Sequence, residues 1–312
     1  MPIQITQSST NIDLSSKELK KLQNEFDKNH CILLSNFLHP SFLCFIQEQI
    51  YNSGFKMRVH KEIGEEYVPI NNKIKYLMNF LLNNKTLFKV LEEITGCKKI
   101  RNFLGRIYSF MPKKGNFDSW HNDLVEDRTL ALSINLSKKI YSGGILQIRN
   151  RHSKKIIHEI ANTGFGDAVI FRLGEELQHR VTSVTGKVAK TAFAGWFRLK
   201  PDYVLQTKTL PQKTNLKVSK EITLNDSIKI NEFVFTKNEG DNLTLMNMNN
   251  NRYYILNSVG ANLWELISNT QNLKKVFSTM KGEYNIAPNI LKKDILKQFQ
   301  ELQNVGLIKT LN

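Results

Sequence analysis

The N-terminal third of the chain alternates helical stretches with one short strand-like run. Ser15 and Ser16 precede the first stretch as candidate N-caps, and Gly96 follows the last one as a candidate helix end. The run CILLSNFL, residues 31–38, indicates a short strand between the first two helices. The third helical stretch, residues 72–95, is long enough for one helix or two. Three segments have apolar positions at helical spacing: residues 17–30, 40–52 and 72–95.

The pattern changes between Ile100 and Phe197. Apolar runs become short, many alternate with polar residues, and turn-forming residues separate them. Alternation at a period of two is typical of strands with one buried face. Many short strands at close spacing predict an antiparallel sandwich or barrel. The runs are NFLGRIYSFM, TLALSINLS, ILQIRN, KKIIHEI, GDAVIFRL, HRVTSV and AKTAFAGWF.

The rest of the chain predicts a linker and a small mixed domain. Residues 199–224 hold two prolines, several Lys and Thr, and little pattern, which favours a linker. FVF, LTLMNM and RYYILN then predict three strands, and three helical patterns follow: SVGANLWELIS, NLKKVFSTMKGEYN and NILKKDILKQFQELQNVGL. This domain, residues 225–312, is near the smallest size that holds its own core.

Composition narrows the class of protein. The chain of 312 residues is 41% hydrophobic, which is enough for one large and one small domain. No run approaches the ~18 to 20 apolar residues of a membrane span, and the N-terminus lacks the pattern of a secretory signal. The three cysteines, Cys31, Cys44 and Cys97, have no paired spacing, which argues against a disulfide framework and a Cys-based zinc site. We therefore expect a cytoplasmic protein.

The net charge of +16 suggests a polyanionic partner. Most of the surplus lies in the first 225 residues, because residues 226–312 contain ten Lys or Arg against eight Asp or Glu. No helix carries a dense basic stripe interleaved with aromatic residues, and a Lys-rich chain has a basic surface without any specific partner. An acidic peptide would suit this surface as well as DNA.

A His-x-Asp triplet stands just before the run TLALSINLS. On an extended strand, His121 and Asp123 would point to the same face. Such triplets are common, and a solvated strand end explains one equally well. His179 follows downstream, after GDAVIFRL. Two imidazoles and one carboxylate hold non-haem Fe(II) on one face of an octahedron and leave three positions open, so we expect these residues to be catalytic iron ligands.

Residues 100–198 resemble the prolyl-hydroxylase-type family of 2-oxoglutarate/Fe(II) dioxygenases. The resemblance implies a double-stranded β-helix (a jelly-roll or cupin-like core), with helical support from residues 15–98. It also implies Fe(II) as cofactor, 2-oxoglutarate and O2 as co-substrates, and hydroxylation as the default reaction, with desaturation as an alternative. The matching motifs are Tyr108, Gly115, His121-x-Asp123, INLS, Gly143-Gly144-Ile145-Leu146, GDAVIF, His179-Arg180-Val181 and Trp196.

This resemblance also implies a pocket for 2-oxoglutarate. In the family, a basic residue binds the distal carboxylate of the co-substrate. Lys190 keeps the expected spacing to Trp196, but it comes slightly late after Gly186, so Lys187 is the competing candidate. Tyr108 can add a phenol hydrogen bond, although a core tyrosine fits the pattern equally well. Asn135, on the inward-facing row of its strand, is a further candidate for the same pocket.

Residues 231–309 resemble the PqqD-like family, whose relatives bind the leaders of ribosomally synthesised, post-translationally modified peptides. The match rests on Leu256-Asn257, Gly260, Leu263-Trp264, Leu266, Asp294 and Gly306-Leu307-Ile308. The resemblance implies a winged-helix-like domain that binds a leader peptide as an added strand, between its third strand and its last helix. Simple core packing would explain the apolar row of that helix as well. The implied peptide-binding residues are Arg252, Tyr253, Tyr254, Ile255, Leu296, Phe299 and Gln303.

Together the two resemblances predict a mainly β protein with α-helices. We expect a dioxygenase domain over residues 1–198, a linker over 199–224 and a PqqD-like domain over 225–312. The expected activity is oxidation of a ribosomal precursor peptide. The alternative is a non-catalytic regulator that binds peptide or DNA. DNA is the less favoured partner because the last helix, residues 289–305, offsets its lysines with acidic residues and has no Arg to read guanine. The oligomeric state is left open.

Overall fold

A computed structural model divides the chain into two compact units, Met1–Val204 and Leu205–Asn312. Gly115 and most of the predicted linker, residues 201–219, lie outside the residues that the structure describes. No helix in the described part of the chain is long and apolar enough to cross a membrane. The described residues are 3–60, 64–112, 118–125, 127–161, 163–200, 220–240 and 242–311.

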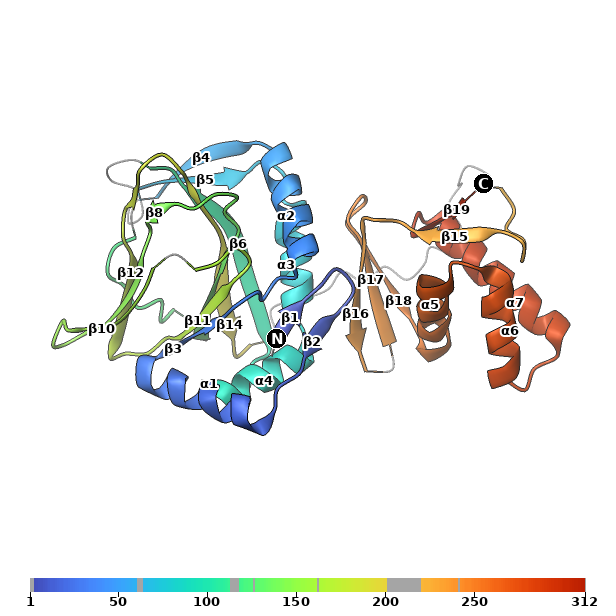
Figure 1. The fold of residues 1–312 in the computed structure, drawn as a ribbon, viewed down its shortest axis with the longest axis horizontal. Coiled ribbons are helices and arrows are strands. Elements are labelled where there is room, and N and C mark those ends of the chain that lie inside the picture. Colours follow the sequence, from blue (N-terminus) through green and yellow to red (C-terminus); the bar gives the residue numbers. More distant parts are fainter. Residues whose placement is uncertain are drawn as a thin grey trace. The chain divides into compact units, whose positions relative to one another are not determined.

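The larger sheet of the first unit has seven antiparallel strands in the order β3-β11-β7-β14-β6-β5-β4 (Figure 1). The sequence predicts β3 but not the β4–β5 hairpin, which lies in the region expected to give only helical support. The strands span Cys31–Leu34 (β3), Phe55–His60 (β4), Gly64–Pro69 (β5), Asn102–Phe110 (β6), Arg128–Asn135 (β7), Ala168–Arg172 (β11) and Lys190–Arg198 (β14).

A smaller sheet of order β10-β9-β12 packs against the larger one (Figure 1). Its strands are Leu146–Asn150 (β9), Ile156–Ile160 (β10) and Leu177–Val181 (β12), and the short pair Ser142–Gly143 (β8) and Val184–Thr185 (β13) lies beside them. Buried residues from both sheets form one core, among them Tyr108, Ile148, Phe171 and Val181. The arrangement is a double-stranded β-helix, so the predicted fold class is confirmed.

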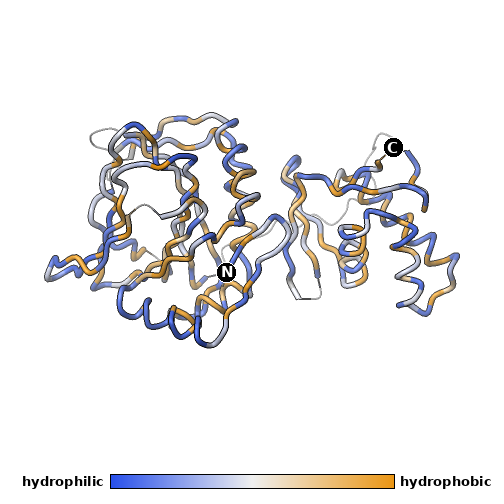
Figure 2. The backbone as a smooth tube through the Cα atoms, in the orientation of Figure 1, coloured by the Kyte–Doolittle hydropathy of each residue, from blue (hydrophilic) through white to orange (hydrophobic). Residues whose placement is uncertain are grey.

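Four helices cover the outer face of the larger sheet (Figure 1): Ser16–Asn29 (α1), Pro40–Asn52 (α2), Lys73–Leu82 (α3) and Lys85–Thr95 (α4). Ser15 caps α1 in a capping box with Glu18, and Gly96 ends α4 in the left-handed conformation, as the sequence predicts. The stretch 72–95 forms two helices, since Asn83 and Asn84 interrupt it. Helix α1 is largely hydrophilic in Figure 2 and buries only Leu22 and Phe26.

Buried polar and aromatic side chains fix the helices to the sheet. The Asn79 side chain of α3 donates to Gly105 O (2.9 Å) and accepts from Gly105 N (2.7 Å), so it satisfies both backbone groups of that residue. Phe88 of α4 contacts Phe197 of β14 edge to face, with ring centroids 6.0 Å apart. A small hairpin at the N-terminus, Ile3–Ile5 (β1) and Thr10–Ile12 (β2), has no counterpart in the sequence prediction.

The second unit is a small α+β domain. Strands Val234–Glu239 (β16), Asn242–Asn247 (β17) and Arg252–Leu256 (β18) form an antiparallel sheet with β18 at its edge. Helices Ser258–Thr270 (α5), Leu273–Glu283 (α6) and Pro288–Asn304 (α7) follow, as predicted, and share one hydrophobic core with the sheet. A further antiparallel pair, Ser227–Ile230 (β15) and Ile308–Leu311 (β19), brings the two ends of the unit together and is not predicted by the sequence.

Candidate iron site and peptide-binding edge

His121 and His179 lie directly opposite each other at the edge of the smaller sheet. His121 N donates to His179 O (3.1 Å) and His179 N donates to His121 O (2.8 Å), which makes one antiparallel bridge beyond strand β12. The two rings lie 4.2 Å apart between centroids, and Phe171 flanks His179 at 4.8 Å. Two residues far apart in sequence are therefore brought together by backbone pairing.

Asp123 reaches the same point by a route that the sequence does not predict. Residues 122–125 are not part of a strand, and Asp123 has a left-handed backbone with φ of 51°. The expectation that His121 and Asp123 share the face of a regular strand is wrong. Even so, Asp123 Oδ2 lies 3.5 Å from His121 Nε2 and 3.3 Å from His179 Nε2. One ligand atom from each residue lies within 4.8 Å of the others.

Neighbouring side chains hold these three residues. Trp196 Nε1 donates to Asp123 Oδ2 (2.8 Å), and Arg128 lies 3.3 Å from Asp123 Oδ1. The Arg128 guanidinium also stacks on the Trp196 ring, 3.8 Å from its centroid. His121 Nδ1 lies 2.6 Å from the carbonyl oxygen of Ser119. A carbonyl only accepts, so the hydrogen is on Nδ1 and Nε2 faces the other two ligand atoms.

The electrostatics of the cluster favour an ionised carboxylate. Burial opposes ionisation of Asp123, but the contacts with His121 and His179 outweigh it and lower its pKa. Burial by itself lowers the pKa of His121, yet Asp123 and Asp118 beside it raise that pKa to about 9. Burial lowers the pKa of His179, which is 6% exposed. A divalent cation bound here would take the place of the proton on His121.

The three residues line a cavity of about 400 Å³ that also contains Tyr108 and Lys190. Lys190 is 8% exposed, and its ammonium donates to Gly144 O (2.7 Å). Burial lowers the pKa of Lys190 to about 8, and the negative charge of Asp118 opposes this shift. Lys187, the competing candidate, is exposed in the turn before β14 and is not among the described residues that line the cavity. Burial raises the pKa of Tyr108, so its phenol stays protonated.

Asn135 lies beside this cavity but uses its amide elsewhere. Its Nδ2 donates to Thr163 O (2.7 Å) and its Oδ1 accepts from Ser137 N (3.0 Å). With Lys190 it lines a separate space of about 20 Å³. The side chain thus joins two loops, one N–H and one lone pair of its amide being used, and its contact with 2-oxoglutarate stays a prediction.

Three arginines of the cavity wall, Arg58, Arg106 and Arg128, are absent from the sequence prediction. Arg128 carries the clearest signal, because it lies five residues after Asp123 at the start of a strand. Arg58 belongs to the β4–β5 hairpin, whose alternation in FKMRVH spans only six residues.

The second unit offers the predicted strand edge, but not every predicted side chain. Arg252 and Ile255 are exposed, Ile255 by 46%, and Tyr253 is half-buried. Tyr254 and Phe299 are 1% and 0% exposed and belong to the hydrophobic core, so their predicted side-chain contacts with a peptide are wrong.

Two residues of helix α7 stay accessible. Leu296 and Gln303 are half-buried. Gln303 Oε1 is buried and accepts no hydrogen bond from any residue that the structure describes.

Family models match both units. Residues 106–198 match the 2OG-Fe(II) oxygenase superfamily, and residues 243–308 match coenzyme PQQ synthesis protein D (PqqD). Residues 106–198 are thus a 2-oxoglutarate/Fe(II) dioxygenase domain, and residues 243–308 are a PqqD-like domain. The family implies Fe(II), with 2-oxoglutarate and O2 as co-substrates. The donor set fits Fe(II), since two imidazole nitrogens and one carboxylate oxygen converge and leave positions open.

Several solved structures are similar to part of this chain. A 2OG-Fe(II) oxygenase-family oxidoreductase from Burkholderia pseudomallei is 10% identical, with 62% of this chain and 95% of that chain covered and a TM-score of 0.46. A Pseudomonas putida prolyl-4-hydroxylase is 15% identical, with coverages of 58% and 99% and a TM-score of 0.45. TbiB1, in complex with the TbiA(beta) leader peptide, is 20% identical, with coverages of 27% and 98% and a TM-score of 0.26. No curated protein matches the dioxygenase chain.

Proposed function

We propose that this dioxygenase oxidises a ribosomal precursor peptide whose leader is bound by the PqqD-like domain. The observation that carries the proposal is the presence, in one chain, of a two-histidine, one-carboxylate site in a cavity and of an open strand edge in a second unit. The match of residues 243–308 to PqqD supports the peptide as substrate, and TbiB1 is a neighbour whose complex contains a leader peptide. Hydroxylation is the expected outcome.

In this proposal His121, Asp123 and His179 hold Fe(II), and each has a side-chain partner or backbone contact that orients it. Bound Fe(II), with 2-oxoglutarate and O2, supplies oxidation of an unactivated C–H bond, and 2-oxoglutarate leaves as succinate and CO2. Lys190 is placed to receive the distal carboxylate of 2-oxoglutarate, because its ammonium lines the cavity and its one described hydrogen bond uses a single N–H. Tyr108 lines the same wall and can donate its phenol hydrogen.

The PqqD-like domain would hold the leader by β-augmentation. Strand β18 is at the edge of its sheet, so every second residue has backbone groups that no strand of the sheet uses. Ile255 and Tyr253 offer exposed or half-exposed side chains along this edge.

A first experiment tests the oxygenase half of the proposal. The full-length protein is mixed anaerobically with Fe(II) and 2-oxoglutarate, and the visible charge-transfer band of the chelate is recorded. We expect a band that disappears in Asp123→Ala and that requires more 2-oxoglutarate in Lys190→Ala. A wild-type protein without a band, under conditions in which it is folded, would contradict the iron assignment.

A second experiment tests the substrate. Short peptides encoded beside the gene are incubated with the protein, Fe(II), 2-oxoglutarate and O2, and their masses are measured. We expect one peptide to gain a single oxygen atom, and its leaderless form to react more slowly at low concentration. Equal reaction rates of the full-length and leaderless peptides would show that the leader does not assist the oxidation. Steeply salt-dependent binding to duplex DNA, without any peptide oxidation, would support the regulator instead.

A further inference from the structure

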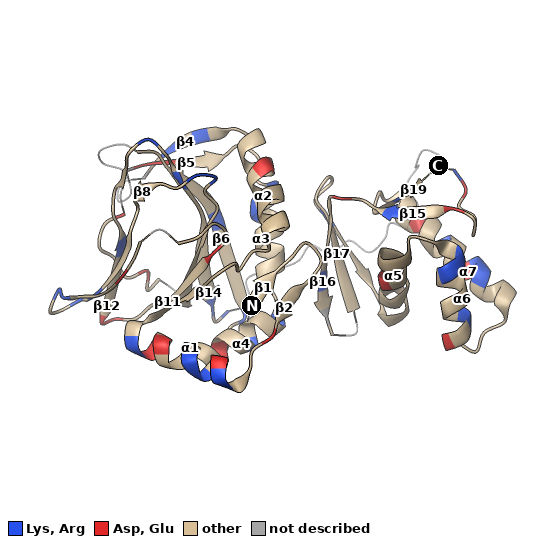
Figure 3. Cartoon of the chain, in the orientation of Figure 1, with Lys and Arg blue, Asp and Glu red and all other residues tan. Residues whose placement is uncertain are grey.

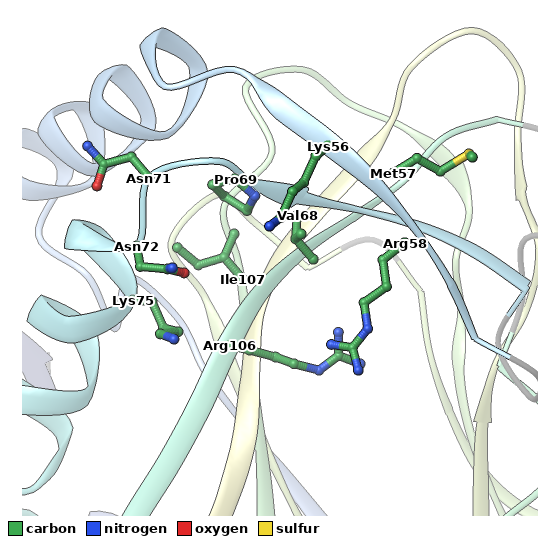
Figure 4. A pocket seen from close by; sticks show the side chains of 10 residues that line it. All are labelled: Lys56, Met57, Arg58, Val68, Pro69, Asn71, Asn72, Lys75, Arg106 and Ile107. Atoms are coloured by element: carbon green, nitrogen blue, oxygen red, sulfur yellow. The ribbon is translucent and has the colours of Figure 1, made fainter.

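A second cavity, which we call the cationic pocket, lies at the edge of the larger sheet (Figure 4). Its volume is about 450 Å³. Strands β4, β5 and β6 and the start of helix α3 form its walls. The residues that matter for its chemistry are Lys56, Arg58, Pro69, Asn72, Lys75 and Arg106.

The pocket exists because two neighbouring strands separate. Strand β5 pairs with β6 only at Tyr67 and Ser109. Continuing this antiparallel register would place Pro69 opposite Ile107, and proline has no N–H to donate to a neighbouring strand. The gap that follows is lined by Pro69 and Ile107 themselves, and by Asn72 and Lys75 of α3. Pro69 therefore accounts for the opening between β5 and β6.

Positive charge dominates the pocket. Four of its lining residues are cationic, namely Lys56, Arg58, Lys75 and Arg106, and no described lining residue is acidic. Figure 3 shows basic residues on β4 and β6, and in Figure 4 the Arg58 and Arg106 guanidinium groups extend toward each other. Two like charges approach in this way only with a counter-charge, and Glu66 supplies one.

Glu66 does not neutralise the pocket. It is 0% exposed, accepts a hydrogen bond from Arg106 and lies 3.9 Å from Arg58. One carboxylate thus faces two guanidinium groups, and its Oε1 accepts no hydrogen bond from a described residue. The side chain of Arg58 is 56% exposed, so its remaining N–H groups are available to a ligand.

The start of helix α3 adds to the positive potential. The helix begins at Lys73, has no acidic residue in its first turn, and receives no side-chain cap from Asn72. The Asn71 amide oxygen accepts from Lys73 N (2.8 Å), but no carboxylate in the first turn offsets the partial positive charge of this helix N-terminus. Asn72, at the start of α3, points toward the pocket in Figure 4, and Lys75 lines it as well. An anion in the pocket would meet side-chain cations and this helix end together.

The cationic pocket adjoins the iron cavity. Arg58 and Arg106 line both spaces, and Arg106 lies over the ring of Tyr108, 5.4 Å from its centroid. A chain-like substrate with its reactive residue beside His179 can therefore extend past Arg58 and Arg106 into the pocket. No described lining residue is aromatic, whereas sites for single-stranded nucleic acid stack bases on aromatic rings.

We propose that the cationic pocket binds an Asp or Glu side chain of the substrate peptide, close to the residue that is oxidised. The inference rests on the proposed function and adds a substrate class to it, a core peptide with an acidic residue near its modification site. Arginine suits this role because its planar group binds a carboxylate through two parallel hydrogen bonds.

The test uses the full-length protein and a fluorescein-labelled peptide of alternating Gly and Glu, with binding measured by anisotropy near physiological salt. Lys56→Gln/Lys75→Gln removes two charges of the pocket and leaves the residues of the iron cavity unchanged. We expect its affinity for the peptide to fall about 3- to 10-fold, as for two partly exposed ion pairs. The control Lys98→Gln/Lys99→Gln removes two exposed charges of the same unit and should bind like wild type.

Three outcomes would overturn the inference: no binding of the acidic peptide by wild type, equal weakening in both double variants, or tighter pocket-dependent binding of an oligothymidylate. The charge-transfer band, recorded on the same samples, separates this result from the proposed function. If the charge-transfer band forms but the Lys56→Gln/Lys75→Gln variant binds the peptide as wild type does, the role of the cationic pocket is wrong and the proposed oxidation stands. If peptide binding depends on the pocket but no charge-transfer band forms, the pocket stands and the proposed oxidation is wrong.

Discussion

The Asp123 carboxylate is held in place by two side chains from strands of the larger sheet. Trp196 donates to one of its oxygens, and Arg128 lies beside the other while stacking on the Trp196 ring. A left-handed backbone is uncommon for a residue other than glycine, so these contacts help to keep Asp123 in that conformation. Trp196 and Arg128 are positioning residues that act on the iron site through Asp123.

Trp196→Phe tests this role. The substitution removes the N–H donor but leaves an aromatic ring for Arg128 to stack on. Loss of such a partner commonly lowers metal affinity about 10- to 100-fold, and we expect a decrease of this size for Fe(II) in anaerobic equilibrium dialysis. Trp264→Phe, the same change in the core of the PqqD-like domain, should leave Fe(II) affinity unaltered. Wild-type affinity in Trp196→Phe would show that the indole N–H does not orient Asp123.

Lys190 predicts a pH dependence for co-substrate binding. Burial lowers the pKa of Lys190 to about 8, so the ammonium is charged below that pH and loses its proton above it. Affinity for 2-oxoglutarate should therefore be highest near pH 7. It should fall as the pH rises through 8, by about tenfold for each further pH unit. Titrations of the charge-transfer band between pH 7 and 9 measure this directly.

Lys190→Arg is the matched variant, because a guanidinium remains charged throughout this range. Its affinity for 2-oxoglutarate should stay flat with pH, even if the longer side chain weakens binding at every pH. The same decline in Lys190→Arg as in wild type would place the titrating group elsewhere.

The residues of the site could be predicted by type but not by geometry. His121, Asp123 and His179 are residue types that together bind iron, so they can be recognised in the sequence without knowledge of the fold. Their convergence depends on a bridge and on one left-handed residue, which no residue spacing reports. Nothing in the sequence singles out Arg106 among the 44 Lys and Arg residues of the chain, since its importance comes from neighbours in other strands.

At the scale of elements, the predictions succeed where a pattern is long or has a clear stop. The longer barrel strands, such as β6 and β14, run over nine residues, α1 begins with a capping box, and α4 ends at a glycine. Elements of three or four residues, such as β1, β2 and β19, are too short to show a period. The β4–β5 hairpin is not predicted because FKMRVH alternates over six residues only, and its apolar residues Met57 and Val59 are exposed and mark no buried face.

Asn79 joins helix α3 to strand β6 and gives a prediction about stability. Its amide satisfies both backbone groups of Gly105 in a buried site. Asn79→Leu would leave these groups unpaired, and we expect it to lower the free energy of unfolding by about 2 to 4 kcal/mol. The measurement is urea denaturation followed by circular dichroism. Asn24→Leu, on the exposed face of α1, is the control and should change stability by less than about 0.5 kcal/mol.

At the scale of the whole molecule, the chain combines a dioxygenase cavity in one unit with an exposed edge strand, β18, in the other. In the proposed function, a leader bound at β18 would keep the attached core peptide at a high effective concentration for the iron site. Such a tether would raise the frequency of encounter and add nothing to the oxidation step. Tethering should therefore lower the apparent KM for the precursor and leave kcat unchanged.

Ile255→Glu separates these two parameters. A charged side chain in the middle of the β18 edge disfavours an acidic or apolar leader strand and alters no residue of the dioxygenase unit. We expect the KM for the full-length precursor to rise about tenfold or more, with kcat within twofold of wild type, as for the loss of an effective-concentration advantage. Turnover of the leaderless core peptide should not change. Ile290→Glu, an equally drastic change at an exposed position of α7, should match wild type in all three measurements. A fall in kcat with unchanged KM in Ile255→Glu would mean that the PqqD-like domain acts on the chemistry and not on delivery of the peptide.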